Sequence, residues 1–323
     1  MINNKQYNII SLFSGAGGLD LGFKKAGFNT IYANEYDKNI WQTFEYNFKD
    51  TKLDKRDIRN IQSSEIPECV GIIGGPPCQS WSEAGAMRGI NDSRGKLFFD
   101  YIRIIKEKKP LFFLAENVSG ILHERNKEAF NAILTGFKDL GYRVKYQLLN
   151  AKDYNVPQDR ERVFIVGFLN NVDFQFPEPN KKHLTLKDAI DSLKDSAKSY
   201  NQQELDGFNH EYYTAGFSTI FMSRNRVRSW NEQSFTIQAG GRHAPLHPQA
   251  PKMEFVEQNK RIFKKGSEEL YRRLSVRECA RVQTFPDNFK FIYNNILDGY
   301  KMVGNAVPVN LGFEMAKQIA KYL

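Results

Sequence analysis

The chain has 323 residues, 41% hydrophobic and 26% charged, a composition typical of a soluble protein long enough for two domains. Its 46 Lys and Arg against 37 Asp and Glu give a net charge of +9, which favours an anionic partner but also suits an ordinary basic enzyme. Three cysteines without paired spacing argue against a disulfide framework or a zinc cage. No signal peptide or membrane-spanning run is evident, so we expect a cytoplasmic protein that does not enter a membrane.

The first half of the chain alternates short apolar runs with helical patterns, which is typical of a parallel sheet covered by helices. We expect strands at residues 8–13, 30–34, 70–75 and 111–115, and helices at 19–26, 39–48, 96–108 and 126–140. Two further strands, 143–150 and 162–168, are joined by too few residues for a parallel crossover. The predicted fold is therefore α/β, a Rossmann-like sheet with an antiparallel last strand.

After residue 168 this alternation stops, and the chain turns polar and proline-containing. We expect a smaller, mostly β or irregular domain at residues 177–296, whose last part, about 271–296, forms a hinge with a helix at 275–283. An amphipathic helix through residue 322 is expected to return to the first domain. The first domain then comprises residues 1–176 and 297–323.

A glycine-rich turn, residues 13–18, follows the first strand and opens the first helix. The G-x-G-x-x-G pattern of dinucleotide-binding proteins fails, because the sixth position counted from Gly15 is Asp20. Glu35 ends the second strand, where a carboxylate accepts hydrogen bonds from ribose hydroxyls. The pattern favours a nucleoside site without a pyrophosphate, and a purely structural turn stays open as the alternative.

Cys78 follows Pro76 and Pro77 directly after the apolar run 70–75. Two prolines end the strand and hold the next residue in a rigid turn, which is where a nucleophilic thiol belongs. Free cysteine is also among the most buried residue types, so a packing role remains open.

Glu116 comes directly after five apolar residues, and desolvation there raises the pKa of a carboxyl group toward the range useful for general acid catalysis. Gln158, Arg160 and Arg162 share one face of an extended segment, from which the two guanidiniums can orient Glu116 or hold a substrate carbonyl. The alternatives are a solvated glutamate and arginines paired with surface carboxylates.

Arg224, Arg226 and Arg228 alternate along the second domain, and Arg242 follows. Arginine reads guanine in the major groove and also binds phosphates, although a charged strand without a ligand is the simpler alternative. His243 and His247 are four residues apart, as in some zinc sites, but prolines 245 and 248 argue against a helix there. We expect no metal.

Taken in order, these segments resemble the DNA (cytosine-5) methyltransferases. The resemblance rests on residues 13–18, 76–79, 116–118, 158–162, 273–283 and 304–308. Residues 271–285 and 218–248 are most similar to bacterial restriction-modification enzymes that modify the internal cytosine of GGCC. Two positions depart from the family pattern: Arg56 replaces a frequent glycine, and Ser275 replaces the usual threonine.

The resemblance implies S-adenosylmethionine as cofactor, and catalysis by Cys78, Glu116, Arg160 and Arg162. Cys78 would add to carbon 6 of a cytosine rotated out of the duplex, while Glu116 acts at ring nitrogen 3 and Arg162 at the exocyclic oxygen. The implied cofactor-binding residues are Phe13, Gly15, Gly17, Glu35, Tyr36, Asp57, Ile58, Pro77, Leu97 and Asn305.

The implied partners are double-stranded DNA and a restriction endonuclease of the same specificity, and we expect a monomer. Residues 80–95 are predicted to close over the DNA, and Ile220 to act as a wedge. The expected DNA-binding residues are Gln79, Ser82, Arg94, Ile220, Arg224, Arg226, Arg228 and Arg242. Methylation of transfer RNA, a nicotinamide-dependent oxidoreductase and a catalytically silent DNA-binding relative remain as alternatives.

Overall fold

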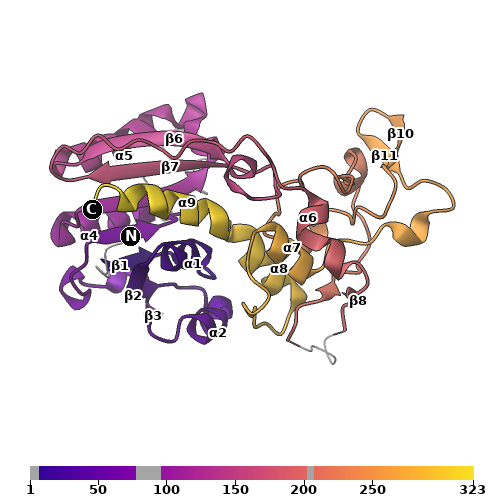
Figure 1. Ribbon diagram of the computed structural model, residues 1–323, viewed down its shortest axis with the longest axis horizontal. Coiled ribbons are helices and arrows are strands. Elements are labelled where there is room, and N and C mark those ends of the chain that lie inside the picture. Colours follow the sequence, from indigo (N-terminus) through magenta and orange to yellow (C-terminus); the bar gives the residue numbers. More distant parts are fainter. Residues whose placement is uncertain (1–6, 78–95, 202–206) are drawn as a thin grey trace.

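The computed structural model of the protein describes residues 7–77, 96–201 and 207–323. Its main sheet has the strands β1 (Tyr7–Leu12), β2 (Phe28–Asn34), β3 (Lys52–Asp54), β4 (Gly71–Gly74), β5 (Phe112–Val118), β6 (Arg143–Asn150) and β7 (Glu161–Phe168). They lie in the order β3-β2-β1-β4-β5-β7-β6 (Figure 1). The chain thus forms the α/β sheet that the alternating pattern predicts.

The antiparallel end of the sheet is confirmed. Strand β7 inserts between β5 and β6 and runs antiparallel to both, whereas β1 to β5 pair in parallel. The register places Val118 opposite Arg162 and Glu116 opposite Phe164. The carboxyl end of β5 therefore meets the start of β7, which brings Arg162 close to Glu116.

The helices are α1 (Gly18–Lys25), α2 (Lys38–Asn47), α4 (Lys96–Lys108), α5 (Lys127–Asp139), α6 (Leu186–Ile190), α7 (Val276–Val282), α8 (Ile296–Asn305) and α9 (Val309–Ala320). Successive strand residues alternate between the two faces of the sheet. Phe113 packs in the cluster that includes α4 and α5, and Phe112 packs in the cluster that includes α1 and α9. The C-terminal helix thus covers the sheet, as predicted.

Three features differ from the expectation. Strand β5 continues through Glu116 and Asn117 to Val118 instead of ending at residue 115. The edge strand β3 and the helix α8 were not predicted. The sequence of β3 has only three residues, two of them charged, and glycines 299 and 304 weaken the helical signal of α8. Asn295, whose side chain accepts a hydrogen bond from the Leu297 amide, is the cap that marks the start of α8.

The smaller part of the molecule contains little regular structure. Between α6 and α7 the strands are β8 (Lys198–Ser199), β9 (Glu211–Tyr212), β10 (Glu254–Glu257) and β11 (Lys260–Ile262), with short 3₁₀ turns between them. The β10–β11 hairpin projects at the end of the molecule opposite the main sheet (Figure 1). Among the described helices, none combines the length and apolar character needed to cross a membrane.

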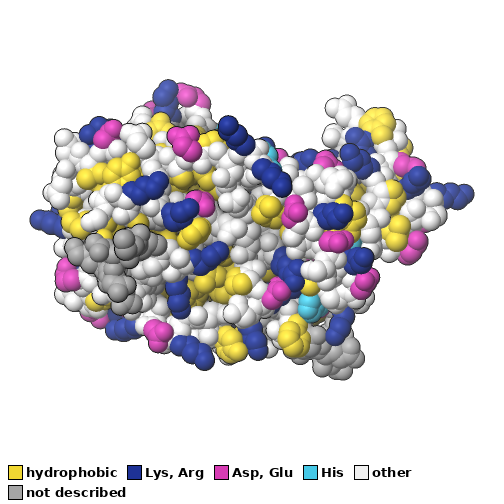
Figure 2. Space-filling model, viewed as in Figure 1, with side chains coloured by type: hydrophobic (Ala, Val, Ile, Leu, Met, Phe, Trp, Pro, Cys, Tyr) yellow, Lys and Arg dark blue, Asp and Glu magenta, His cyan; other side chains and the backbone are white. Residues whose placement is uncertain are grey.

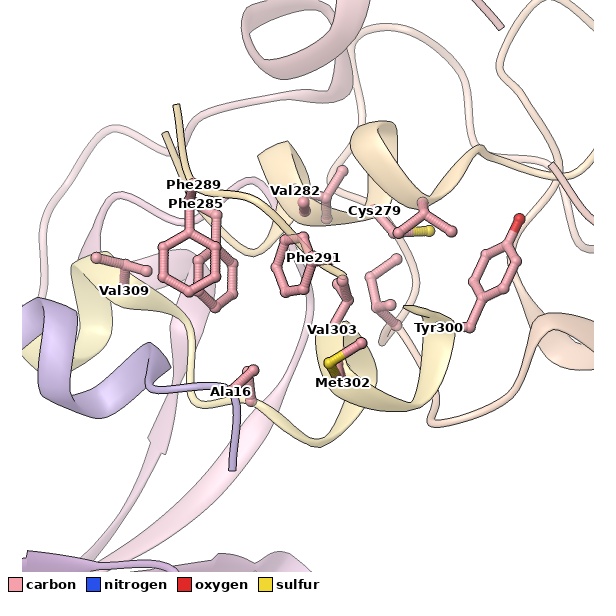
Figure 3. Packing of buried hydrophobic residues seen from close by; sticks show 14 of the residues in the cluster. Ala16, Cys279, Val282, Phe285, Phe289, Phe291, Tyr300, Met302, Val303 and Val309 are labelled. Carbon is pink, nitrogen blue, oxygen red and sulfur yellow. The ribbon is translucent and has the colours of Figure 1, made fainter. Parts of the chain in front are cut away.

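One hydrophobic cluster runs across the region between the two parts (Figure 3). Ala16, in the glycine-rich turn, packs in the same cluster as Phe285, Phe289 and Val303. The packing is therefore continuous from the start of α1 through α7 to α8. The predicted boundary at residues 296 and 297 falls inside this cluster and remains a prediction.

Candidate active site

A cavity of about 430 Å³ opens at the carboxyl edge of the sheet. Open α/β sheets bind ligands at this edge, and the volume lies within the usual range of about 300–1,000 Å³ for small-molecule sites. Its wall combines the ends of β1, β2, β4 and β5 with the segment after α8. The lining residues include Phe13, Ser14, Gly15, Glu35, Asp37, Gly75, Pro76, Pro77, Glu116, Asn117, Asn305 and Val307.

The glycine-rich turn adopts backbone conformations that few side chains tolerate. Phe13 has φ 55°, Gly15 has φ 55° and Gly17 has φ 86°. A Cβ atom on Gly17 would lie 2.2 Å from the ring of Phe48, while one on Gly15 would meet nothing within 4 Å. Gly15 therefore lets a ligand approach the backbone closely, and Gly17 is required by packing. Left-handed Phe13 is strained, which is common at binding sites.

Glu35 fastens the turn to the end of β2. Its carboxylate accepts hydrogen bonds from the amides of Gly15 at 2.9 Å and Asp37 at 2.7 Å. The pKa of Glu35 is raised, because the effect of burial exceeds the opposing effect of the two amide hydrogen bonds. Asp37 in turn accepts from Lys301 of α8 at 2.6 Å. These contacts connect the cavity wall to α8.

Glu116 forms a buried ion pair at the opposite side of the cavity. Its Oε1 lies 2.9 Å from Nε of Arg162, and their side chains are 11% and 14% exposed. Burial raises the pKa of Glu116, opposed first by the charge of Arg162 and then by that of Arg160. The Asn117 amide donates to the Pro76 carbonyl at 3.0 Å. The end of β5 therefore holds the proline turn beside the buried acid.

Arg160 is 1% exposed and serves mainly as a connector between segments. Its guanidinium donates to the carbonyls of Ile237 at 2.9 Å, Gly304 at 2.8 Å and Ala306 at 3.1 Å. Gln158 is also buried and accepts from the Ile237 amide. The positive charge of Arg160 acts to lower the pKa of Glu116. A catalytic role for Arg160 remains a prediction.

The other predicted cofactor residues differ in position. Pro77 and Asn305 line the cavity, whereas Tyr36 is 69% exposed beside it and Leu97 packs against the sheet core. Asp57 caps the 3₁₀ turn Ile58–Asn60, in which Ile58 is buried. Arg56, the departure from glycine, is exposed and pairs with the buried Asp54 and the exposed Glu65.

The predicted DNA-binding residues of the smaller part fall into two groups. Ile220 is 71% exposed, and Arg224 and Arg242 are also exposed. Arg226 is 8% exposed and donates to main-chain carbonyls, while Arg228 pairs with Glu232 at 3.2 Å and stacks on Phe235. Cys78, Gln79, Ser82, Arg94 and the predicted loop 80–95 lie outside the described residues.

The sequence analysis missed one buried acid. Asp20 on α1 is completely buried, and neither carboxylate oxygen has a hydrogen-bond partner among the described residues. Burial raises the pKa of Asp20 to about 7. The sequence analysis used Asp20 only as evidence against a dinucleotide motif. Its position on the apolar face of a helix was the signal that could have found it.

The described residues contain no cluster of three or more potential metal ligands. His247 is buried, with Nε2 3.4 Å from Glu278, while His243 is exposed. Burial lowers the pKa of His247 to about 4. His247 therefore packs in the interior beside α7, whereas His243 faces solvent.

The sheet order, the reversed β7 and the cavity at the carboxyl edge are those of an S-adenosylmethionine-dependent methyltransferase. A prophage-encoded protein from E. coli, described as a DNA modification methyltransferase, superimposes with a TM-score of 0.74 and 25% identity. The match covers 98% of this chain and 99% of that one.

The model of the family "C-5 cytosine-specific DNA methylase" matches residues 7–321. The Type II methyltransferase M.FnuDI of Fusobacterium nucleatum is 59% identical over 98% of this chain and 94% of its own length. M.MthTI of Methanothermobacter thermautotrophicus is 57% identical over 98% of both chains. The chain belongs to this family and is a DNA cytosine methyltransferase, of the type found in restriction-modification systems. The family implies S-adenosylmethionine as the methyl donor.

Proposed function

We propose that the protein methylates carbon 5 of the internal cytosine of GGCC in duplex DNA, through a transient covalent bond from Cys78. The observation that carries this proposal is the buried Glu116, which is paired with Arg162 and lines the same cavity as Pro77, the residue before Cys78. An acid with a raised pKa and a cation at this place suit the far side of a pyrimidine ring.

The chemistry follows from the weak nucleophilicity of carbon 5. The Cys78 thiolate adds to carbon 6, and the displaced electron pair moves toward nitrogen 3, where Glu116 supplies a proton. Arg162 donates to the exocyclic oxygen. Carbon 5, now enamine-like, would take the methyl group as its bond to the sulfonium sulfur breaks, so that S-adenosylmethionine would leave as S-adenosylhomocysteine. Loss of the carbon 5 proton to water and expulsion of the Cys78 thiolate then restore the ring double bond, and nitrogen 3 returns its proton to Glu116.

The cavity suits this cofactor. Gly15 leaves space for a ligand against the backbone, and the buried Ser14 hydroxyl has no partner among the described residues. Glu35 uses its two amide hydrogen bonds to hold the turn, and its remaining lone pairs are available for ribose hydroxyls. The proposed set further comprises Phe13, Gly17, Tyr36, Asp57, Ile58, Pro77, Leu97 and Asn305.

Recognition of GGCC is proposed from the similarity of residues 218–248 to enzymes of that specificity. The exposed guanidiniums of Arg224 and Arg242 suit bidentate contacts with guanine. Arg228, together with Gln79, Ser82 and Arg94, completes the proposed direct DNA contacts, and the buried Arg226 contributes through the main chain that its guanidinium holds. The relatives in restriction-modification systems support a partner endonuclease of the same specificity, and a monomer is proposed.

Mechanism-based trapping tests this proposal. A duplex with 5-fluorocytosine at the internal position of GGCC, incubated with S-adenosylmethionine, is expected to form an adduct that survives denaturation, because fluorine cannot leave as the proton does. Cys78→Ser should give no adduct, and Glu116→Gln should form it about 10²–10⁴ times more slowly. An adduct with Cys78→Ser would refute the covalent route. Equal trapping on a scrambled duplex, or preference for RNA of the same sequence, would refute the proposed substrate.

A further inference from the structure

Two buried arginines hold one irregular segment, residues 213–221, which carries the exposed Ile220. Resting on the proposed function, we propose that Arg273 and Arg226 are positioning residues that fix this segment so that Ile220 enters the duplex when the target cytosine leaves it. The segment contains no helix or strand before the 3₁₀ turn Phe221–Ser223. Something other than regular backbone pairing must therefore fix its shape.

Arg273 holds the first half of the segment. Its side chain is 2% exposed, and its guanidinium donates to the carbonyls of Tyr213 at 3.2 Å, Ala215 at 2.7 Å and Gly216 at 3.1 Å. The guanidinium also lies 4.0 Å from the centre of the Phe217 ring. One side chain thus binds three main-chain carbonyls within residues 213–216 and the aromatic ring that follows them.

Arg226 holds the second half. Its Nε donates to the Phe221 carbonyl at 2.8 Å, and one terminal nitrogen donates to the Ile220 carbonyl at 3.0 Å. Its guanidinium lies 4.9 Å from the centre of the Phe221 ring. The Ser223 hydroxyl also donates to the Ile220 carbonyl, at 2.8 Å. The backbone of Ile220 is therefore fixed, although its side chain is 71% exposed.

These contacts replace the usual partners of a buried cation. Neither arginine forms an ion pair with a carboxylate within the described residues, and burial lowers the pKa of both. A buried charge is costly unless hydrogen bonds satisfy it, so carbonyl dipoles and aromatic faces must stabilise these guanidiniums. Lysine cannot donate to several carbonyls in one plane, which makes the contacts specific to arginine.

The support behind the segment is rigid. Phe217 contacts Phe221 and Phe263, with ring centres 5.0 Å apart in each pair, and Phe263 stacks on Tyr271 at 4.2 Å. The backbone held on these aromatic rings presents the exposed Ile220 four residues before the exposed Arg224. Apolar side chains that separate stacked bases are held in this way, because a mobile wedge would lose entropy on insertion.

A fluorescence assay of base unstacking tests the inference. A GGCC duplex with 2-aminopurine beside the target cytosine should brighten on binding the wild-type protein with S-adenosylhomocysteine. We expect Ile220→Ala and Arg273→Lys each to lower the unstacking equilibrium constant roughly tenfold, because an inserted apolar side chain offsets part of the cost of separating stacked bases. Cofactor affinity should stay unchanged. The double variant should lose no more than Ile220→Ala alone, because Arg273 acts through Ile220.

Arg261→Lys is the matched control, because Arg261 stacks on Phe255 and forms no hydrogen bond with the segment in the described structure. Additive losses in the double variant, or normal brightening with Arg273→Lys, would overturn the inference. If Arg273→Lys does not fold, Arg226→Lys replaces it in the same double-variant comparison with Ile220→Ala, and the outcome tests the inference in the same way. Absence of brightening with the wild-type protein would count against the proposed function itself.

Discussion

Three carboxyl groups that line the cavity have pKa values raised by burial: Asp20, Glu35 and Glu116. Glu116 forms a direct ion pair with Arg162, so burial and the charge of Arg162 oppose each other there. Asp20 has the polar neighbours Ser11 and Thr30 and no cationic partner among the described residues, so burial dominates. The first arrangement keeps a proton available next to a substrate. In the second arrangement, ionisation of Asp20 lowers the free energy of unfolding, because the charge is buried.

Asp20→Asn is expected to stabilise the protein at high pH and to leave it unchanged at low pH. Burial raises the pKa of Asp20 from 3.8 to about 7, so the folded state binds this proton more tightly than the unfolded state. The stability that the proton provides is complete below the unfolded value and is lost as the pH rises through about 7. The difference between variant and wild type should grow to as much as about 4 kcal/mol at pH 8.

Urea unfolding of both proteins between pH 4 and pH 8 measures this difference. Asp188→Asn is a suitable control, because Asp188 accepts hydrogen bonds from Thr185 at the surface and its pKa is lowered. Its removal should destabilise the protein, most strongly at neutral pH. A stability difference for Asp20→Asn that does not vary with pH would show that Asp20 is not protonated in the folded protein.

At the scale of elements, apolar periodicity predicted the long strands and helices because each buries one continuous face. The α4 and α5 helices and strands β6 and β7 begin and end within about two residues of the expected limits, the usual uncertainty of helix ends. Strand β3 is too short to show such a face. Helix α8 does bury one face, but two of the residues on that face are glycines, which weaken the helical signal in the sequence. Both form because neighbouring elements pair with them.

The same reasoning explains which site residues could be predicted. Glycines, prolines and carboxylates at strand ends can be recognised from local sequence, and Gly15, Pro77 and Glu35 are among the residues that line the cavity. Their roles in binding stay predictions. The alternation of Arg224, Arg226 and Arg228 predicts one shared face but not their partners. Arg226 is held by carbonyls of residues 220 and 221, and Arg228 by Glu232 and the Phe235 ring. These contacts depend on tertiary packing, which alternation does not specify.

Ser275, which stands where the family usually has threonine, caps the start of α7 with its hydroxyl group. Its Oγ accepts from the Glu278 amide, and its own amide donates to the Glu278 carboxylate at 2.7 Å. Ser275→Thr keeps this capping box and should change the free energy of unfolding little. Ser275→Ala should cost about 1 kcal/mol, measured by thermal or urea unfolding. An equal loss in both variants would show that space around the buried Ser275, and not the cap, is decisive.

At the scale of the whole molecule, net charge and local packing contribute differently to DNA binding. The chain has a net charge of +9. On the face seen in Figure 2, Lys and Arg lie over both parts of the molecule with acidic residues between them. Such a distribution supports attraction to any polyanion. Sequence selectivity must come from a few exposed side chains on a well-packed backbone, whereas affinity comes from many basic side chains.

Arg224→Ala and Arg242→Ala separate these two contributions. If each arginine reads a guanine, its loss should cost about 1–3 kcal/mol on GGCC and much less on a scrambled duplex. The slope of the logarithm of affinity against the logarithm of salt concentration should then stay nearly constant, because the phosphate contacts remain. Titrations of both duplexes at several salt concentrations measure this. Equal weakening on both duplexes, with the slope reduced by about 0.9 per residue, would instead assign these arginines to phosphates.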